Sequence, residues 1–217
     1  MKNSDHDEQE PTPRDDAAHA LNELLTVIAG YAELSRELLP HDGAVAIYQT
    51  EILRAAEAAA SLVSTLSSRP RAAAIAPHAV PAPVVDGAAP HWHRRVLLVD
   101  DEPAVRKFTS AILALNGFDV VAVGSAPDAI AACEARDGCF GLVISDVVMS
   151  PVDGLELVTA LAERWPALPA LLISGFPGVA AQPLDRHGRH IPFLSKPYTN
   201  FQLLAKVRSI LAALPRP

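Results

Sequence analysis

Residues 94–108 read RRVLLVDDEPAVRKF, a stretch in which a short apolar run is followed at once by three acidic residues. The apolar run Val96–Val99 has the length and the branched side chains typical of a fully buried strand. After the acidic residues, an amphipathic stretch covers Pro103–Leu115 and opens with a proline, as helices often do. The stretch therefore predicts a buried strand, a polar turn and a helix.

The same alternation of an apolar run and an amphipathic stretch recurs along the following hundred residues or so. The expected strands are Val96–Val99, Val120–Val123, Leu142–Ser145, Ala170–Ile173 and Pro192–Leu194. The expected helices are Pro103–Leu115, Ala126–Ala135, Gly154–Arg164, a weak one near Gly178–Leu184, and Asn200–Leu214. Alternation with short connections predicts an α/β fold, a doubly wound parallel sheet with helices on both faces.

Polar residues stand where these strands end. Asp100 and Asp101 follow the first strand, Asp146 the third, Ser174 the fourth and Lys196 the fifth. Ligands of open parallel sheets collect outside the carboxyl ends of the strands, so we expect these side chains to converge at one edge. Clustered carboxylates need a cation, and oxygen ligands suit Mg²⁺, while a lysine and a hydroxyl beside it suit a phosphoryl group. A single aspartate after a strand is usually a cap or turn residue. That interpretation is much weaker when five such polar positions occur together at the strand ends.

Four segments of this region resemble the receiver domain of two-component response regulators, over about residues 94–214. The segments are RRVLLVDDEPAVRKF (94–108), GLVISDVVMSPVDGLEL (141–157), ALLISGFPG (170–178) and IPFLSKPY (191–198). The resemblance implies a five-stranded, flavodoxin-like parallel sheet in the order 2-1-3-4-5, with the domain assigned to residues 94–217. It also implies Mg²⁺ as the cofactor.

The resemblance assigns the metal-binding roles position by position. Asp146 matches the phosphoacceptor of the family, and Asp101 matches a direct Mg²⁺ ligand. The backbone carbonyl of Val148 matches the third protein ligand, beside Asp101 and Asp146. Asp100 matches the neighbouring acid that supports the metal through water.

The remaining matches concern the phosphoryl group and the switch. Ser174 matches the hydroxyl that moves toward the phosphoryl group, Lys196 the family's lysine, and Phe193 the switch aromatic. The Lys196–Pro197 peptide bond is expected to be cis. The resemblance implies that Asp146 takes its phosphoryl group from a phosphohistidine, on a histidine kinase or a histidine phosphotransfer protein. The acyl phosphate would then bias a protein-interaction surface around the fourth and fifth strands.

Residues 17–68 carry the pattern of a helical hairpin. Apolar residues step by three and four in two runs, separated by a turn at residues 40–43, which is the heptad spacing of helices packed side by side. The first helix also carries a second apolar stripe, Leu24, Val27, Tyr31, Leu34 and Leu38. One partner helix cannot cover two stripes, so we expect two hairpins to pair into a four-helix bundle, a homodimer through residues 17–68.

A polar stripe remains on that first helix. It consists of His19, Asn22, Glu23, Thr26, Gly30, Glu33 and Glu37. Helical spacing puts these residues within about 40° of His19, so we expect this face, and His19 with it, to be solvated.

The segment HALNELLTVIAGYAEL, residues 19–34, resembles the phosphoacceptor helix of sensor histidine kinases and places His19 on the phosphorylated histidine. Two positions depart from that motif: Ala20 replaces the usual acidic residue, and Glu23 replaces an amide or hydroxyl residue. The eleven glycines never occur as the G-x-G turns of that family's ATP-binding domain, and no Walker P-loop is present. ATP-driven kinase activity is therefore excluded.

Composition excludes other classes. Eighteen basic against 25 acidic residues give a net charge of −7, which argues against nucleic acid or an anionic membrane surface as a partner. The longest uncharged stretch, residues 165–184, is broken by prolines, so no membrane span is expected. The charged N-terminus is no signal peptide, so we expect a cytoplasmic protein. Residues 1–16 read as a disordered tail and 69–93 as a linker rich in proline and alanine.

We expect a response regulator, not an enzyme, that accepts a phosphoryl group on Asp146 with Mg²⁺ and carries no DNA-binding output, because few residues follow the last helix. Two alternatives stay open: a phosphorelay protein that passes the group between His19 and Asp146, and a dimeric adaptor that works without phosphorylation. Metal-dependent phosphatases also use a nucleophilic aspartate after a strand, but typically in a D-x-D motif, whereas two valines follow Asp146.

Overall fold

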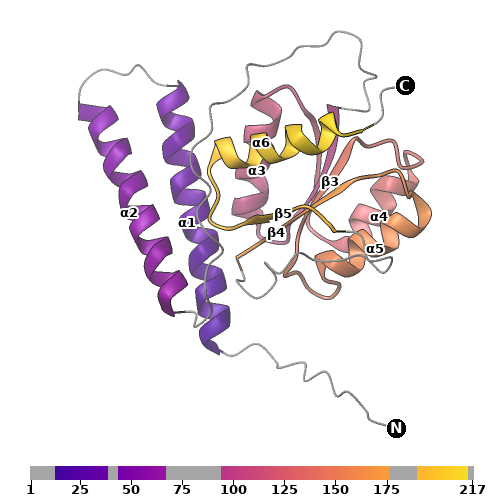
Figure 1. The fold of residues 1–217 in the computed structure, drawn as a ribbon, viewed down its shortest axis with the longest axis horizontal. Coiled ribbons are helices and arrows are strands. Elements are labelled where there is room, and N and C mark those ends of the chain that lie inside the picture. The colour runs from indigo at the N-terminus through magenta and orange to yellow at the C-terminus, as the bar shows by residue number, and fades with distance from the viewer. Residues whose placement is uncertain (1–12, 39–43, 67–93, 176–189, 215–217) are drawn as a thin grey trace.

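The computed structural model describes residues 13–38, 44–66, 94–175 and 190–214, coloured in Figure 1. The predicted linker at 69–93 and the weak helix near 178–184 lie outside the described residues.

Five parallel strands form one sheet in the order β2-β1-β3-β4-β5, which confirms the predicted order 2-1-3-4-5. The strands are β1 (Arg95–Val99), β2 (Asp119–Val123), β3 (Leu142–Asp146), β4 (Ala170–Ser174) and β5 (Phe193–Ser195). Each strand lies within one residue of its predicted range. The prediction succeeds best for β1, β3 and β4, because strands covered on both faces read as continuous apolar runs.

Helices cover both faces of this sheet, as predicted (Figure 1). They are α3 (Pro103–Leu115), α4 (Ala126–Glu134), α5 (Gly154–Arg164) and α6 (Asn200–Ala212). Side-chain caps fix where they begin: Ser125 caps α4, Asp153 caps α5, and Thr199 forms a reciprocal capping box with Gln202 at α6. The helices therefore begin immediately after the loops at the sheet's carboxyl edge.

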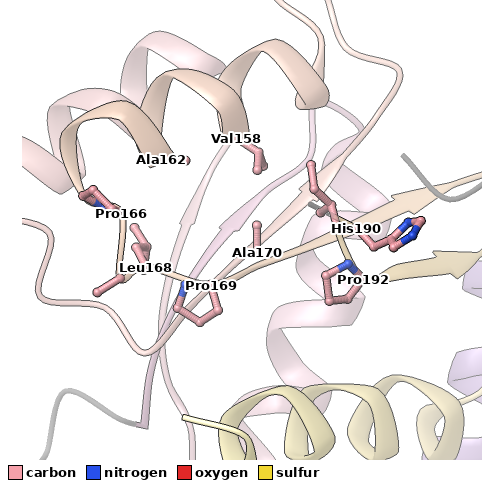
Figure 2. A pocket seen from close by; sticks show the side chains of 10 residues that line it. Val158, Ala162, Pro166, Leu168, Pro169, Ala170, His190 and Pro192 are labelled. Atoms are coloured by element: carbon pink, nitrogen blue, oxygen red, sulfur yellow. The ribbon is translucent and has the colours of Figure 1, made fainter. Parts of the chain in front are cut away.

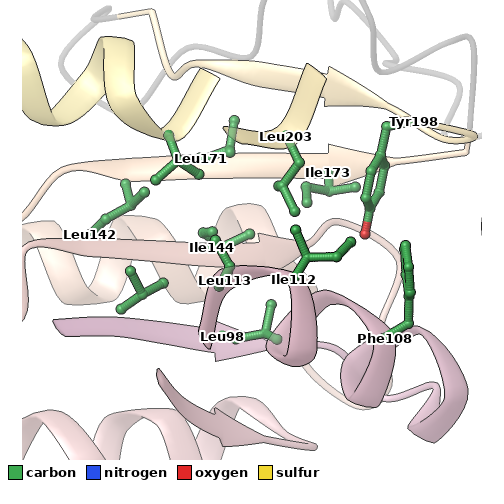
Figure 3. Packing of buried hydrophobic residues seen from close by; sticks show 12 residues of the cluster. Leu98, Phe108, Ile112, Leu113, Leu142, Ile144, Leu171, Ile173, Tyr198 and Leu203 are labelled. Atoms are coloured by element: carbon green, nitrogen blue, oxygen red, sulfur yellow. The ribbon is translucent and has the colours of Figure 1, made fainter. Parts of the chain in front are cut away.

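Side chains that alternate along the central strands fill two layers of core. Toward α3 and α6, Leu98 and Ile144 pack with Phe108, Ile112 and Leu203, all buried (Figure 3). Toward α4 and α5, a second cluster is built around residues Leu97, Val99, Val143, Ala129 and Leu157. One buried apolar layer on each face therefore packs the sheet against its helices.

The N-terminal segment forms a hairpin of two helices, α1 (Pro13–Leu38) and α2 (Ala44–Leu66). Leu25 and Ala29 of α1 pack against small residues of α2, Ala56 and Ala60, so the two helices approach closely. None of the helices that the structure describes is both long and apolar enough to cross a lipid bilayer.

Helix α1 begins at Pro13, four residues before the boundary predicted at the end of the tail. Proline is favoured in the first turn of a helix, because its backbone angle is already helical and its missing N–H has no partner there. The high charge density of residues 1–16 favoured a disordered tail in the prediction, so the start of the helix was placed too late.

The described side chains of the polar stripe of α1 are buried or half-buried, so the prediction of a solvated face is wrong for them. Asn22, Thr26 and Gly30 are buried, because α1 lies between α2 and the sheet domain and contacts α3 and α6 (Figure 1). The Thr26 hydroxyl donates to the carbonyl of Asn22 at 2.8 Å, which satisfies it inside the contact. His19 lies in α1, but its side chain falls outside the described part of the structure.

Candidate functional site

Three carboxylates meet at the carboxyl edge of the sheet. Asp100 and Asp101 follow β1, and Asp146 is the last residue of β3. Because Val99 pairs with Ser145 across these neighbouring parallel strands, the residues that follow leave the sheet at one level. One carboxylate oxygen from each aspartate lies within 4.8 Å of the others, with Asp100 and Asp146 buried and Asp101 exposed.

The ammonium of Lys196 reaches into this cluster. Its Nζ lies 2.7 Å from Asp146 Oδ2 and 3.5 Å from Asp100 Oδ2, and the side chain is fully buried. Strand β5 brings it there: Ser195 pairs with Ser174, and the Lys196 backbone N–H donates to the Ser174 carbonyl at 2.8 Å. The Lys196–Pro197 peptide bond is cis, as predicted, and Ser150–Pro151 is cis as well.

The charges at this edge perturb one another. Burial raises the pKa of Asp100 to about 7; the Lys196 ammonium opposes this rise and the Asp146 carboxylate adds to it. Burial and Asp146 also raise the pKa of Asp101. Burial by itself would lower the pKa of Lys196, but Asp146 and Asp100 outweigh it, so the pKa is raised and the lysine stays charged. One ammonium among three carboxylates leaves net negative charge.

Oxygen ligands and an excess of negative charge fit a hard divalent cation, and these three carboxylates could form a Mg²⁺ site. The backbone N–H of Val148 donates to Asp146 Oδ1 at 3.3 Å, which folds the loop after β3 back over the carboxylate. The Val148 side chain is exposed. The proposed role of its carbonyl as a metal ligand stays a prediction.

Ser174 and Phe193 lie on the two strands beyond Asp146. Ser174 ends β4, one residue past the partner of Asp146 in the ladder, and is buried. Phe193 is half-buried in β5 and packs against a cluster that includes Val147 and Ile191. The structure thus puts Ser174 on the strand next to Asp146 and Phe193 one strand farther away, and their switching roles stay predictions.

Arg106 also holds the edge, and the sequence analysis missed it. Its Nη1 donates to the backbone carbonyls of Asp100, at 2.5 Å, and Asp101, at 3.2 Å. The Glu102 N–H donates to Asp100 Oδ1 at 2.9 Å, so the acidic loop is tied on both sides. The position of this arginine, one turn into the helix that follows the acidic loop, could have predicted the contact.

Two side chains of α1 contact residues of the site, and neither was predicted to lie there. Glu23 Oε1 lies 3.4 Å from Lys196 Nζ, and Asn22 Nδ2 donates to the Gly175 carbonyl at 3.0 Å. Gly30 was the sequence feature that could have indicated this contact. A glycine inside a helix costs about 1 kcal/mol relative to alanine and often marks a place where another element packs closely.

A pocket of about 270 Å³ lies at the other edge of the sheet (Figure 2). Ala170 and Pro192 line it where β4 and β5 begin, and most of its other described lining residues are apolar as well. His190 is the one titratable residue among the described lining residues. This pocket is therefore remote from the carboxylates and offers no groups for phosphoryl chemistry.

Comparisons with known proteins agree with this geometry. The family model for the response regulator receiver domain matches residues 96–208. The response regulator protein FleR of Pseudomonas aeruginosa is 41% identical over 123 residues, which cover 56% of this chain and 25% of FleR. The response regulator receiver protein CpdR of Brucella abortus is 30% identical over 120 residues, 55% of this chain and 98% of CpdR.

The chain thus spans only a quarter of the length of FleR, but nearly all of CpdR. Among solved structures, a receiver domain protein from Clostridium thermocellum is similar in fold, with a TM-score of 0.51 and 18% identity, over 54% of this chain and 94% of that one. Because the family model matches more than half of the chain and spans all five strands with their acidic edge, the chain belongs to the response regulator receiver domain family.

Proposed function

We propose that this chain is a response regulator whose Asp146 accepts a phosphoryl group from a phosphohistidine of a histidine kinase or phosphotransfer protein. The observation that carries the proposal is the buried pair of Lys196 and Asp146, 2.7 Å apart, at the acidic edge of the sheet. Receiver domains are phosphorylated by histidine kinases, and this chain belongs to that family. In this function the chain takes up and loses a phosphoryl group and turns over no substrate of its own.

The residues at the carboxyl edge of the sheet have different roles in phosphoryl transfer. An Asp146 oxygen attacks phosphorus while the P–N bond breaks, and the leaving imidazole keeps the bonding pair and takes up a proton. Two donors orient the carboxylate, the Val148 N–H at Oδ1 and the Lys196 ammonium at Oδ2. Lys196 also neutralises charge that spreads over the phosphoryl oxygens. When bound by Asp101, Asp146 and the Val148 carbonyl, with Asp100 through water, Mg²⁺ supplies further neutralisation of that charge.

The acyl phosphate then acts on the neighbouring strands. It offers new acceptor oxygens to the Ser174 hydroxyl, and the movement of Ser174 leaves space into which Phe193 turns. Phe193 packs against Val147 and Ile191, so its rotation repacks the surface near β4 and β5. That surface is the output, and its partner is a protein.

The functional unit is a homodimer through the hairpin. Besides Tyr31, which lies beside Phe108 of the receiver, the described large apolar side chains exposed on α1 and α2 are Leu21, Leu24, Ile28, Ile52 and Leu62. They stand on both helices and away from the contact between them, so a second copy of the hairpin can cover them in a four-helix bundle.

One observation favours a second function, transfer between His19 and Asp146. Glu23 of α1 contacts Lys196, and His19 lies one helical turn before Glu23 in the same helix. A helix that meets the phosphoacceptor edge at this point brings position 19 into its neighbourhood.

The test is phosphorylation of the full chain, both by phosphoramidate with Mg²⁺ and by candidate histidine kinases, followed on phosphate-affinity gels. We expect an alkali-labile acyl phosphate that Asp146→Asn abolishes and that Asp119→Asn, at the opposite edge of the sheet, leaves intact. An alkali-stable label that survives Asp146→Asn and disappears when His19→Gln is added would establish the relay. A label that survives both changes would show that the acceptor lies elsewhere, and no label from any donor would favour the phosphorylation-independent adaptor.

A further inference from the structure

Helix α1 contacts the receiver at three points along the edge that surrounds Asp146. Asn22 donates to the carbonyl of Gly175, the residue after β4, at 3.0 Å. Glu23 pairs with Lys196, after β5, at 3.4 Å. Farther along the helix, Glu33 Oε2 accepts the backbone N–H of Asn200, the first residue of α6, at 2.7 Å. All three receiver groups belong to segments that follow the strands, where a phosphodonor must approach.

The packing between these polar contacts is close. A Cβ added to Gly30 would lie 1.7 Å from Cζ of Phe108, whose ring is fully buried with α1 in place. Tyr31 lies beside the same ring, with centroids 5.4 Å apart. Glycine at position 30 is therefore what allows the backbone of α1 to reach the receiver.

We propose that α1 covers the surface of the receiver through which a phosphodonor reaches Asp146. We further propose that phosphorylation of Asp146 releases α1 from this surface. The inference rests on the proposed function. While α1 is docked, Glu23 lies against the lysine that must serve the incoming phosphoryl group. The partner that fits this face of the receiver is thus a polar helix of the same chain.

The charges explain why phosphorylation favours release. Lys196 is shared among Asp146 at 2.7 Å, Glu23 at 3.4 Å and Asp100 at 3.5 Å. Phosphorylation of Asp146 replaces one negative charge by about two and adds strong acceptor oxygens for the ammonium. Glu23, with a side chain only 15% exposed, then loses this ion-pair partner and faces a like charge. Repulsion across a partly buried contact favours the undocked state.

The interface is polar enough to be reversible. Three of its contacts are hydrogen bonds or ion pairs, and the exposed apolar residues of α1, such as Leu24 and Ile28, lie on another face of the helix. Polar interfaces within a chain resemble transient ones between proteins. Release of α1 from the receiver therefore leaves the dimer face and the hairpin intact.

Two variants of the full chain separate docking from folding. Gly30→Ala adds the clashing Cβ, yet alanine favours helix by about 1 kcal/mol over glycine, so α1 itself is kept or strengthened. Glu23→Gln removes the charge at Lys196 and keeps the shape. The matched controls are Leu24→Ala, on the exposed apolar face of α1, and Glu134→Gln, which breaks an exposed ion pair with Arg164.

The first measurement is hydrogen exchange of residues 103–115, which α1 covers in part. We expect protection in the wild type and both controls, and faster exchange in Gly30→Ala with unchanged helix content. Wild type loaded with beryllofluoride and Mg²⁺, a mimic of the acyl phosphate, should exchange like Gly30→Ala.

The second measurement is the rate of phosphorylation by phosphoramidate with Mg²⁺. If the docked state outweighs the released one by about ten to one, both variants should react about tenfold faster than wild type, and the controls at the wild-type rate. Equal rates despite lost protection would overturn the occlusion and leave the proposed function standing. Unchanged exchange after beryllofluoride loading would overturn the release. No phosphorylation of any variant, Gly30→Ala included, would overturn the proposed function and this inference together.

Discussion

Lys196 and Asp146 show how a buried charge is kept at this edge. Burying an ammonium is costly, and burial alone would lower the pKa of Lys196, but two buried carboxylates more than offset this effect. The carboxylates need the lysine in turn, because burial and mutual repulsion raise the pKa of Asp100 to about 7 even with the ammonium present. The residues of the site are therefore interdependent, and removing one leaves uncompensated charge.

Lys196→Met should consequently destabilise the fold by about 3–5 kcal/mol in the absence of divalent cations, because it leaves buried carboxylates without their ammonium. Mg²⁺ should recover a larger part of the stability in the variant than it adds to wild type, since the remaining charge is more negative. Urea denaturation with and without Mg²⁺ measures both effects. The control is Lys107→Met, an exposed position on α3. An equal response of Lys196→Met and wild type to Mg²⁺ would contradict the charge argument.

Tyr198 carries a pH dependence of stability. Burial raises its pKa to about 12, although the hydrogen bond with Thr109, 2.7 Å between the two oxygens, opposes the rise. The unfolded chain loses this proton near pH 10, so between pH 10 and 12 the folded state binds more protons and its stability falls as pH rises. This contribution is complete below pH 10 and is lost through pH 12, at about 1 kcal/mol per pH unit.

Tyr198→Phe should remove that dependence. At pH 8 the variant should be less stable by about 1 kcal/mol, for the lost hydrogen bond. Between pH 10 and 11 the wild type should lose about 1 kcal/mol more than the variant, so the difference shrinks. Urea denaturation at pH 8, 10 and 11 gives the comparison, and a difference that stays constant over this range would refute the assignment.

At the scale of elements, the start of α5 fixes the end of β3. A Cβ on Gly154, the first residue of α5, would lie 1.9 Å from the backbone carbonyl oxygen of Asp146. The Gly154 N–H donates to the Val147 carbonyl at 2.9 Å, so the two elements are also hydrogen-bonded. The phosphoacceptor is thus positioned by a helix that contributes no side chain to the chemistry.

Gly154→Ala should therefore cost about 1–3 kcal/mol of stability and slow phosphorylation, because the backbone around Asp146 has to shift. Ala131→Ser, at an exposed position of α4 away from the carboxylates, is the control. Thermal denaturation and phosphoramidate rates test the two parts. A Gly154→Ala protein with wild-type stability and rate would show that the helix can move away freely.

The elements also show how far the sequence predicts this molecule. The five strands and the residues that follow them were predictable, because burial on both faces makes a strand apolar throughout and parallel strands end at one edge. The docked face of α1 was not, because periodicity identifies polar positions without showing what they contact. Asn22 and Glu23 contact Gly175 and Lys196, which lie 153 and 173 residues farther along the chain, and no local pattern encodes that pairing.

At the scale of the whole molecule, α1 uses three faces. One face, with Leu25 and Ala29, packs on α2; a second, with Asn22 and Thr26, lies against the receiver. The third face is apolar and exposed, and Leu24 on it is 60% exposed. Two faces of α1 are packed, and the third is apolar and exposed. We therefore expect another surface to cover the third face. The receiver contact and the proposed dimer can therefore coexist.

The last prediction concerns that dimer. The chain should be dimeric by light scattering at micromolar concentration, because covering the exposed side chains of Leu24 and Ile28 of α1 and of Leu62 of α2, which is 65% exposed, removes apolar area from water. Leu24→Glu with Ile28→Glu should yield a folded monomer, since like charges would face each other across the two-fold axis of a bundle. The variant Leu115→Glu, which changes an equally apolar residue exposed on the receiver, should stay dimeric.

A monomeric wild type would mean that these apolar side chains of the hairpin face solvent or a different protein, and a dimer that survives the double change would place the interface elsewhere. Because the changed residues lie away from Glu23 and Gly30, the monomer should still phosphorylate at the wild-type rate, which separates assembly from access to Asp146.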